Sequence, residues 1–345
     1  MKVLMTADTV GGVFTYATDL AAALRAQGNE VVLATFGAAL SEGQRRMLRG
    51  TPVHSSSLAL EWMPDPWRDV AAAERWLLEV EADERPDVVH LNAYAHGAAP
   101  FPAPTLVVGH SCVLSWWRAV RGGDAPAQWR RYRSVVAAGL RGADAVVAPT
   151  HWMLHELQRL YGPLPARRAV IHNGSAAPPA GGPKEAFVLA AGRFWDEAKN
   201  LAVLDAAADG LGHPVLVAGE PRDGFRPAAV QPVGHLDRDD LAALRSRAAV
   251  FAAPALYEPF GLGVLEAALS GCSLVLGDIP PLRELWDGAA RFVDPRDPEA
   301  LRAALRDALL APRPAVGHAA RYSVQSMAGS YESLYAELTR AAVAA

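Results

Sequence analysis

The chain of 345 residues is 51% hydrophobic and 20% charged, which excludes a disordered protein and suffices for two domains of ordinary size. Its formal net charge of −4 gives no electrostatic reason to expect nucleic-acid binding. Its two cysteines, Cys112 and Cys272, provide neither a disulfide framework nor the spacing of metal ligands. The first ten residues lack the apolar region of a signal peptide, and no apolar run reaches the ~18 residues of a membrane span. We therefore expect a reduced, cytosolic, metal-free protein.

Short apolar runs alternate with amphipathic segments in the first half of the chain. Gly28 closes the first helical segment, Pro86 stops a long one, and Thr150 is an expected N-cap. The expected strands are 2–7, 30–36, 52–58, 87–91, 105–108, 145–148 and 168–172, and the expected helices are 13–26, 41–49, 67–84, 125–140 and 151–161.

Residues 175–183, SAAPPAGGP, form the clearest linker, because Pro and Gly dominate and no periodicity survives. The alternation then resumes. The expected strands are 187–191, 214–218, 250–253, 274–276 and 291–293, and the expected helices are 199–208, 238–248, 262–269, 282–286, 299–310 and 322–343. This alternation predicts parallel sheets covered on both faces. We predict an α/β protein with two doubly wound, Rossmann-like domains that face a central cleft.

The stretch 257–271, YEPFGLGVLEAALSG, reads as a loop and a helix that follow a buried strand. It carries Glu258 in the loop and Glu266 in an otherwise apolar helix. A buried carboxylate costs several kcal/mol unless a partner pairs with it. Ligands of open parallel sheets bind at the carboxyl ends of strands, and the amides of residues 261–263 would face an anion there. The alternative is a core helix with one paired Glu.

Two further motifs follow strands. Gly11 and Gly12 would let backbone amides approach an anion at a helix N-terminus, although a lone Gly pair more often marks only a tight turn. Arg193 and Lys199 flank the loop after the first strand of the second half and suit a phosphate or diphosphate. Their alternatives are a solvated surface or pairing with Asp196 and Glu197, which lie between them.

His110 ends a strand, where a histidine is either structural or functional. Beyond it, tryptophans and arginines are interspersed between residues 116 and 133. A basic aromatic helix can lie on an anionic membrane and present a lipid-linked acceptor. An acceptor pocket and a solvated helix face are the other interpretations. The residues on this acceptor or membrane side are Trp117, Arg118, Arg130 and Arg131.

Taken together, these motifs resemble the family 4 retaining glycosyltransferases of the GT-B fold over nearly the whole chain. The resemblance is strongest from residue 187 to 301, where the E-x7-E element with its Gly-rich loop is the specific part. The segments that carry it are Gly11-Gly12-Val13, His110, Asn173-Gly174, Gly192-Arg193, Lys199-Asn200, 258–266, 278–284 and 292–301. One departure is the run Ile279-Pro280-Pro281-Leu282, where many relatives have a Gly pair.

The resemblance implies an acceptor-binding N-terminal domain (1–174), a linker (175–184), a domain that binds a nucleotide-diphosphate sugar donor (185–320), and a C-terminal helix (321–345) that crosses back. Arg193 and Lys199 match the pair that neutralises the diphosphate, and Glu258 and His110 match residues that contact the donor sugar. Glu266 matches the residue that binds the ribose. The further donor-binding positions are Gly11, Gly12, Asn173, Gly192, Phe260, Gly261 and Leu262.

By this resemblance the protein transfers a sugar to a hydroxyl acceptor by a front-face mechanism, without metal or other cofactor. Fixed cations would stabilise the charge that develops on the departing diphosphate. We expect a cytoplasmic enzyme, with a peripheral position at the inner face of the membrane left open. The nucleotide, the sugar and the acceptor are not predicted. The alternatives are a non-catalytic sugar-nucleotide-binding protein and a GT-B nucleotide-sugar epimerase.

Overall fold

The computed structural model describes residues 1–176 and 182–344; the centre of the predicted linker, residues 177–181, lies outside this range. The chain forms two compact units. The first unit holds residues 1–118 and 123–174 together with helix α13 (Val324–Ala344). The second unit holds residues 175–323 and the short segment 119–122. The first unit is therefore completed by the last helix of the chain.

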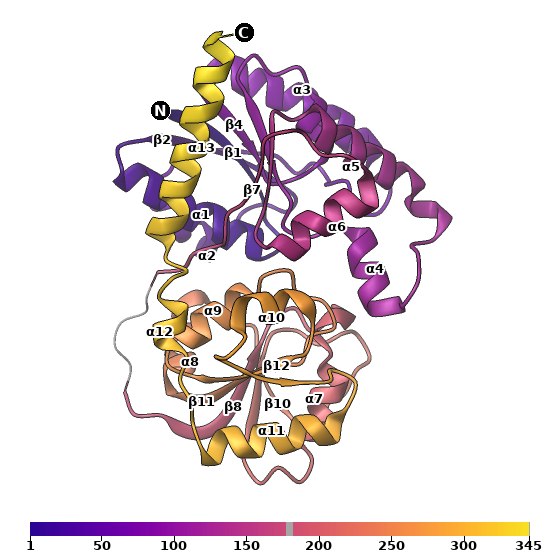
Figure 1. Cartoon of the computed structure of the whole chain (residues 1–345), viewed down its shortest axis with the longest axis vertical. Helices are drawn as coiled ribbons and strands as arrows, with labels where there is room; N and C mark the ends of the chain where they lie inside the picture. Colours follow the sequence, from indigo (N-terminus) through magenta and orange to yellow (C-terminus); the bar gives the residue numbers. More distant parts are fainter. Residues whose placement is uncertain (177–181, 345) are drawn as a thin grey trace. The chain divides into compact units, whose positions relative to one another are not determined.

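The first unit contains a fully parallel sheet of seven strands in the order β3-β2-β1-β4-β5-β6-β7 (Figure 1). Its central strands are buried along their whole length, as expected where helices cover both faces. The strands are β1 (Lys2–Asp8), β2 (Glu30–Phe36), β3 (Val53–Ser55), β4 (Val88–Leu91), β5 (Thr105–Val108), β6 (Ala145–Ala148) and β7 (Arg168–Val170).

Two groups of helices cover this sheet. Helices α3, α5 and α6 share one hydrophobic core cluster with the strands, while α1 and α13 pack on each other. The helices are α1 (Gly12–Ala26), α2 (Glu42–Met47), α3 (Trp67–Glu84), α4 (Val113–Arg121), α5 (Arg130–Gly142) and α6 (His151–Tyr161), with the short 3-10 helices η1 (Ala95–Ala98) and η2 (Ala127–Trp129). Thr150 caps α6 through its side chain, as the sequence predicts.

The second unit repeats this plan with six parallel strands in the order β10-β9-β8-β11-β12-β13. One core cluster contains α7 and α11, and another contains α9 and α10, so both faces of the sheet are covered. The strands are β8 (Glu185–Ala191), β9 (Val215–Ala218), β10 (Gln231–Gly234), β11 (Ala248–Ala253), β12 (Ser273–Gly277) and β13 (Arg291–Val293). The helices are η3 (Glu197–Lys199), α7 (Leu201–Ala208), α8 (Arg238–Arg247), α9 (Leu262–Leu269), α10 (Pro280–Trp286), α11 (Pro298–Leu310) and α12 (Val316–Ala319).

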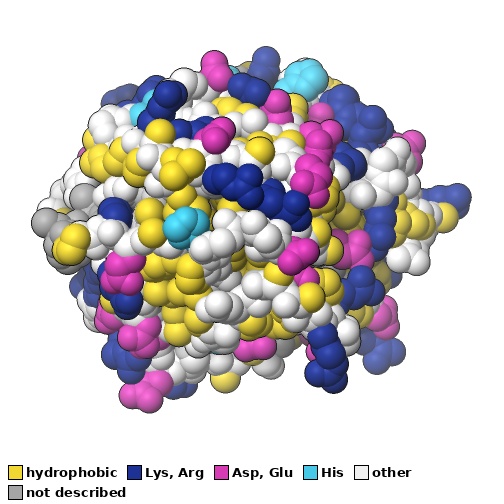
Figure 2. All heavy atoms as spheres, turned by 90° about the horizontal axis from the view of Figure 1, so that it is seen from below, with side chains coloured by type: hydrophobic (Ala, Val, Ile, Leu, Met, Phe, Trp, Pro, Cys, Tyr) yellow, Lys and Arg dark blue, Asp and Glu magenta, His cyan; other side chains and the backbone are white. Residues whose placement is uncertain are grey.

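The two doubly wound units confirm the predicted α/β class, and most elements begin and end close to their predicted bounds. The sequence pattern predicts no bounds for α4 or β10. Strand β10 contains Pro232, which is tolerated because β10 lies at the edge of its sheet. The helix predicted over 199–208 instead breaks at Asn200, whose backbone is left-handed with φ of 60°. Figure 2 shows acidic and basic side chains lying next to one another across the face that it draws, in keeping with the small net charge.

Helix α5 approaches the segment before η1 so closely that only glycine fits at position 139. A Cβ atom at Gly139 would lie 1.8 Å from the carbonyl oxygen of Tyr94. Alanine normally stabilises a helix by about 0.5–1 kcal/mol relative to glycine. At this position the clash outweighs that gain.

We expect Gly139→Ala to lower the free energy of unfolding by about 1–3 kcal/mol, because backbone atoms must shift to admit the methyl group. Urea denaturation measures the change. Gly123→Ala is the matched control, since a Cβ atom there meets nothing within 4 Å. Equal stability of the two variants would contradict the close approach of α5 to the segment before η1.

Candidate functional site

The strand order of the second unit reverses between β8 and β11. From β8 the chain runs outward to β9 and β10, and from β11 it runs the other way to β12 and β13. In open parallel sheets such a point leaves a crevice at the carboxyl ends of the strands, where ligands bind. The loop that follows β8 carries Arg193 and Lys199, and the loop that follows β11 carries Glu258.

These two loops are joined directly. The ammonium of Lys199 donates to the Glu258 carboxylate at 2.5 Å, and each side chain is only 20% exposed. The backbone amide of Leu256 donates to the carbonyl of Ala198 at 2.9 Å, and the Asn200 side chain donates to Pro254 O at 2.9 Å. The left-handed turn at Asn200 thus fixes Lys199 against the neighbouring loop. Lys199 does not pair with Asp196 or Glu197, the alternative that the sequence left open.

Arg193 lies in the same loop as Lys199 but has a different environment. Its guanidinium stacks 5.3 Å from the ring of Trp195, and it forms no ion pair with any residue that the structure describes. Gly192, which precedes it, lies against Gly219, where a Cβ atom would be 1.9 Å from the Gly192 carbonyl oxygen. Gly219 therefore lets the ends of β8 and β9 approach closely. Sequence spacing alone did not reveal that Gly219 contributes to this loop.

Helix α9 begins at the predicted position, after a left-handed Gly261 with φ of 84°. No side chain caps its N-terminus, and Leu262 and Gly263 form its first turn. The Phe260 ring is buried and packs edge-on against Tyr322 at 6.0 Å. Gly261 and Leu262 can therefore present backbone amides to a ligand, whereas the Phe260 side chain serves the core.

Glu266 faces Arg245. This arginine is the charged partner that a mostly buried carboxylate needs. Arg245 lies in the last turn of α8, is 5% exposed, and donates from Nη1 to Oε2 of Glu266. Glu266 retains 17% of its side-chain exposure, so one edge of the carboxylate remains accessible. Sequence reasoning missed Arg245, because nothing in its spacing separates it from the exposed Arg247 two positions later.

We expect Arg245→Ala to destabilise the protein by about 3–5 kcal/mol, because it leaves the mostly buried Glu266 without a partner. The urea unfolding midpoint measures the loss. Arg247→Ala removes an arginine from the same helix end, where Arg247 pairs with the exposed Glu185, and should change the midpoint little. Equal effects of the two substitutions would show that the pair of Arg245 and Glu266 contributes no more to stability than the exposed pair of Arg247 and Glu185.

The first unit has its own reversal of strand order, between β1 and β4. Gly11 and Gly12 lie at the carboxyl end of β1, where Gly11 is the N-cap of α1 and provides no capping side chain. Asn173 lies beyond β7 and is 5% exposed; its Oδ1 has no hydrogen-bond partner among the described residues. Gly11 and Gly12 thus form a turn before α1, whose first amides have no side-chain cap. This geometry fits both the anion-binding and the tight-turn interpretation.

A hydrogen-bond network fixes His110. Asn92, at the end of β4, accepts at Oδ1 from Nε2 of His110 (2.8 Å) and from Nε2 of His90 (3.1 Å). His90 in turn accepts at Nδ1 from the Tyr335 hydroxyl of α13 at 2.6 Å. Asn92 is itself held by Thr6 of β1, whose carbonyl accepts from Nδ2 at 2.6 Å. Because Oδ1 of Asn92 only accepts, His110 is protonated on Nε2 and keeps Nδ1 as an acceptor.

Both histidines are neutral in the folded protein. Burial lowers the pKa of His90 and of His110 to about 3, from an ordinary value of 6.5. The ring of His110 also packs edge-on against the buried Tyr16 at 4.5 Å. His110 can thus accept a hydrogen bond from a hydroxyl group at neutral pH, but it is a poor general acid. Neither His90 nor Asn92 was among the residues predicted from the sequence.

We expect the free energy of unfolding to fall as pH decreases from about 6.5 towards 3. In that window the unfolded chain binds a proton at each histidine that the folded protein does not. Each residue contributes a slope of about 1.4 kcal/mol per pH unit, and the contribution is complete above pH 6.5. Urea unfolding between pH 7 and 5 measures the slope, and His110→Gln should reduce it by about one such increment. An unchanged slope in the variant would contradict the neutral state of His110 in the folded protein.

The four residues predicted for the acceptor or membrane side do not form one group. Arg131 stacks on Trp67 at 4.5 Å, and Trp117 packs on Trp116 at 6.0 Å. Arg118 pairs with Asp124 at 2.9 Å and lines the same surface pocket as Arg130. A single basic aromatic helix is therefore not present. Trp117 and Arg118 lie in α4, whereas Arg130 and Arg131 lie in α5.

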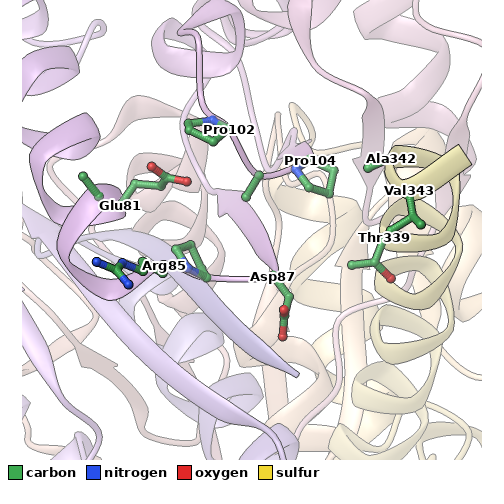
Figure 3. Close-up of a pocket in the computed structure, with 11 residues that line it drawn as sticks. Glu81, Arg85, Asp87, Pro102, Pro104, Thr339, Ala342 and Val343 are labelled. Atoms are coloured by element: carbon green, nitrogen blue, oxygen red, sulfur yellow. The ribbon is translucent and has the colours of Figure 1, made fainter. Parts of the chain in front are cut away.

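Another pocket, of about 470 Å³, lies elsewhere in the first unit, between the end of α3 and helix α13 (Figure 3). It opens at the amino ends of β4 and β5, the opposite edge from the predicted site residues. Figure 3 shows Glu81 and Arg85 on one side and Thr339 and Val343 on the other. Asp87 at its edge accepts from the backbone amide of Lys2 at 2.7 Å. Its position and lining give it no connection with the residues predicted to bind the donor.

Metal-binding clusters and membrane-spanning helices are both absent from the part of the chain that the structure describes. No group of three or more His, Cys, Asp or Glu side chains in the described ranges is placed to hold a metal ion. No helix within residues 1–176 or 182–344 combines the length and apolar character that a membrane crossing requires.

Comparison with known proteins gives consistent matches in both units. The profile described as Glycosyltransferase Family 4 matches residues 10–175, and that described as Glycosyl transferases group 1 matches residues 185–310. Glycogen synthase of Mycobacterium tuberculosis is 31% identical in an alignment of length 255 that covers 65% of this chain and 60% of the relative. The match thus spans about three fifths of that relative's length.

Solved structures share the fold at low sequence identity. Sucrose-phosphate synthase from Thermosynechococcus elongatus superimposes with a TM-score of 0.79 at 20% identity, over 99% of this chain and 100% of that one. HepE from Anabaena, solved in complex with UDP-glucose, gives a TM-score of 0.74 at 16% identity, over 98% and 100% of the two chains. The fold is of the GT-B type. The chain belongs to family 4 of the glycosyltransferases.

Proposed function

We propose that the protein is a retaining glycosyltransferase that moves a hexosyl group from a nucleoside-diphosphate sugar to a hydroxyl acceptor. The observation that carries this proposal is the ion pair of Lys199 and Glu258 at the β8/β11 reversal of strand order, with Glu266 further along the same segment on α9. A cation and two carboxylates at one crevice suit the three parts of such a donor: its diphosphate, its sugar and its ribose.

The diphosphate would bind to cations that are already in place. Lys199 and Arg193 would stabilise the negative charge that develops as the bond between sugar and diphosphate breaks. Glu258 would accept from sugar hydroxyls once the diphosphate competes for Lys199. Charge-assisted hydrogen bonds of this kind contribute roughly 1.5–3 kcal/mol each. These roles need no side-chain base, because the departing phosphate oxygen takes the proton of the acceptor hydroxyl in a front-face reaction.

The ribose would bind at the accessible edge of Glu266, while Arg245 pairs with the carboxylate from the other side. From the first unit, His110 would accept a hydrogen bond from the donor sugar at Nδ1, and the turn at Gly11 and Gly12 would offer backbone amides to the diphosphate. The sequence resemblance supports each of these roles. UDP-glucose is the first donor to test, because HepE was solved with it.

We expect UDP or UDP-glucose at about one hundred times its dissociation constant to add about 2.7 kcal/mol to the free energy of unfolding, without and with EDTA. Thermal-shift measurements with UDP, GDP and ADP identify the preferred base. Glu266→Gln should abolish the shift. Glu299→Gln, which alters an exposed residue of the same unit, should retain it.

A donor that binds is then tested for transfer. NMR of the product should show the anomeric configuration of the donor, and EDTA should not lower the rate. Binding without turnover towards any hydroxyl acceptor would favour a sugar-nucleotide-binding protein. Interconversion of the donor sugar would favour an epimerase. No shift with any nucleotide would contradict the proposed donor site.

A further inference from the structure

A second pocket of the first unit, of about 410 Å³, lies where α4, the start of α5 and the end of α6 meet. We call it the arginine pocket, because the side chains of Arg118, Arg130, Arg133 and Arg159 line it. Its apolar part is formed by Trp129 with the buried Leu114 and Leu160. Guanidinium groups around an apolar floor interact with an anion more strongly than they would in open solvent.

The charges of this pocket do not balance. Arg118 pairs with Asp124 at 2.9 Å, and Arg159 pairs with Glu156 through Nε at 2.8 Å. Arg130 and Arg133 form no ion pair with any residue in the described part of the chain. Four arginines and two carboxylates leave a net charge of +2 around the pocket. An anion with two negative charges would balance it.

The placement of these two arginines also works against local stability. Helix α5 carries Arg130, Arg131 and Arg133 at its N-terminal end and no acidic residue in its first turn. Cations at a helix N-terminus oppose the helix dipole, and like charges three residues apart repel each other. No side chain caps this N-terminus, and Nε1 of Trp129 is buried without a partner among the described residues. A bound anion would relieve the two electrostatic costs at this helix end.

We infer that the arginine pocket binds a phosphate group. Guanidinium forks match phosphate oxygens in a bidentate manner, and a phosphate monoester carries close to the two negative charges that are missing. The volume exceeds that of phosphate alone and suits the phosphate of a larger molecule. A soluble phosphorylated compound and the phosphate-monoester headgroup of phosphatidic acid share this chemistry. The inference goes beyond the proposed transfer, in which Arg130 and Arg133 have no role.

Isothermal titration of the full chain with inorganic phosphate and with glucose 6-phosphate tests the inference. Arg130→Gln/Arg133→Gln should weaken binding at least tenfold. Arg131→Gln removes the same charge from the same turn, but its side chain stacks on Trp67, so affinity should stay within twofold of wild type. Circular dichroism confirms that each variant is folded. Phosphate bound at the proposed donor residues would not respond to either change.

Arg130→Lys/Arg133→Lys separates a built site from diffuse attraction, because it keeps both charges and loses the bidentate geometry. Affinity should fall at least threefold. Equal affinity of this variant and wild type, an equal loss in Arg131→Gln, or a double glutamine variant that binds like wild type would each overturn the inference. So would the absence of phosphate binding by the wild-type protein.

Vesicle sedimentation distinguishes the two sources of phosphate. Vesicles of 30% phosphatidic acid in phosphatidylcholine are compared with pure phosphatidylcholine. Sedimentation that needs Arg130 and Arg133, and that glucose 6-phosphate inhibits, supports a headgroup ligand. Binding of soluble phosphates alone supports a soluble ligand. Glu266→Gln should leave all of these results unchanged, so failure of the donor site and failure of the arginine pocket are told apart.

Discussion

Strands that run parallel within each unit send all the loops that follow them to one edge of the sheet, and the strand order decides which of these loops become neighbours. In the second unit the reversal between β8 and β11 makes the Lys199 loop and the Glu258 loop adjacent. In the resulting ion pair each side chain is still 20% exposed. An anion can therefore reach Lys199 and displace the Glu258 carboxylate from it. The left-handed Asn200 holds Lys199 in this position, and the buried Arg245 separately holds Glu266 on α9.

The sequence predicts elements well where the hydrophobic period is strong and punctuated. The helices 67–84, 151–161 and 262–269 and the strands 30–36 and 105–108 lie within their predicted bounds, because Pro86, Thr150 and Gly261 mark the ends. Strand β10 was missed because a proline inside an apolar run argues against a strand, and only its edge position permits it. The break at Asn200 was missed because its cause is tertiary: the side chain bonds the loop after β11.

The site residues divide in the same way. Glu258, Glu266, Arg193 and Lys199 stand in motifs, so the sequence alone singles them out as candidates. Arg245, Asn92 and His90 belong to no motif, and only the fold brings them to their partners from distant parts of the chain. Arg245 holds the carboxylate of Glu266 in place, and Asn92 fixes the tautomer of His110 and of His90. The aromatic and cationic segment was predicted as one surface because linear spacing cannot show that Arg131 turns to Trp67 while Arg130 turns to a pocket.

The return of α13 to the first unit has a consequence for the order in which the protein is made. The second unit, residues 175–323, is complete in the chain before α13 has been synthesised. At ~5–20 residues per second, roughly 10–30 s separate the last strand of the first unit from the helix that covers its sheet. During that interval His90 and Tyr16 lack the tyrosines of α13 that bury them in the finished protein. A nascent chain therefore carries an uncovered apolar sheet face, which a chaperone can shield, until α13 has left the ribosome.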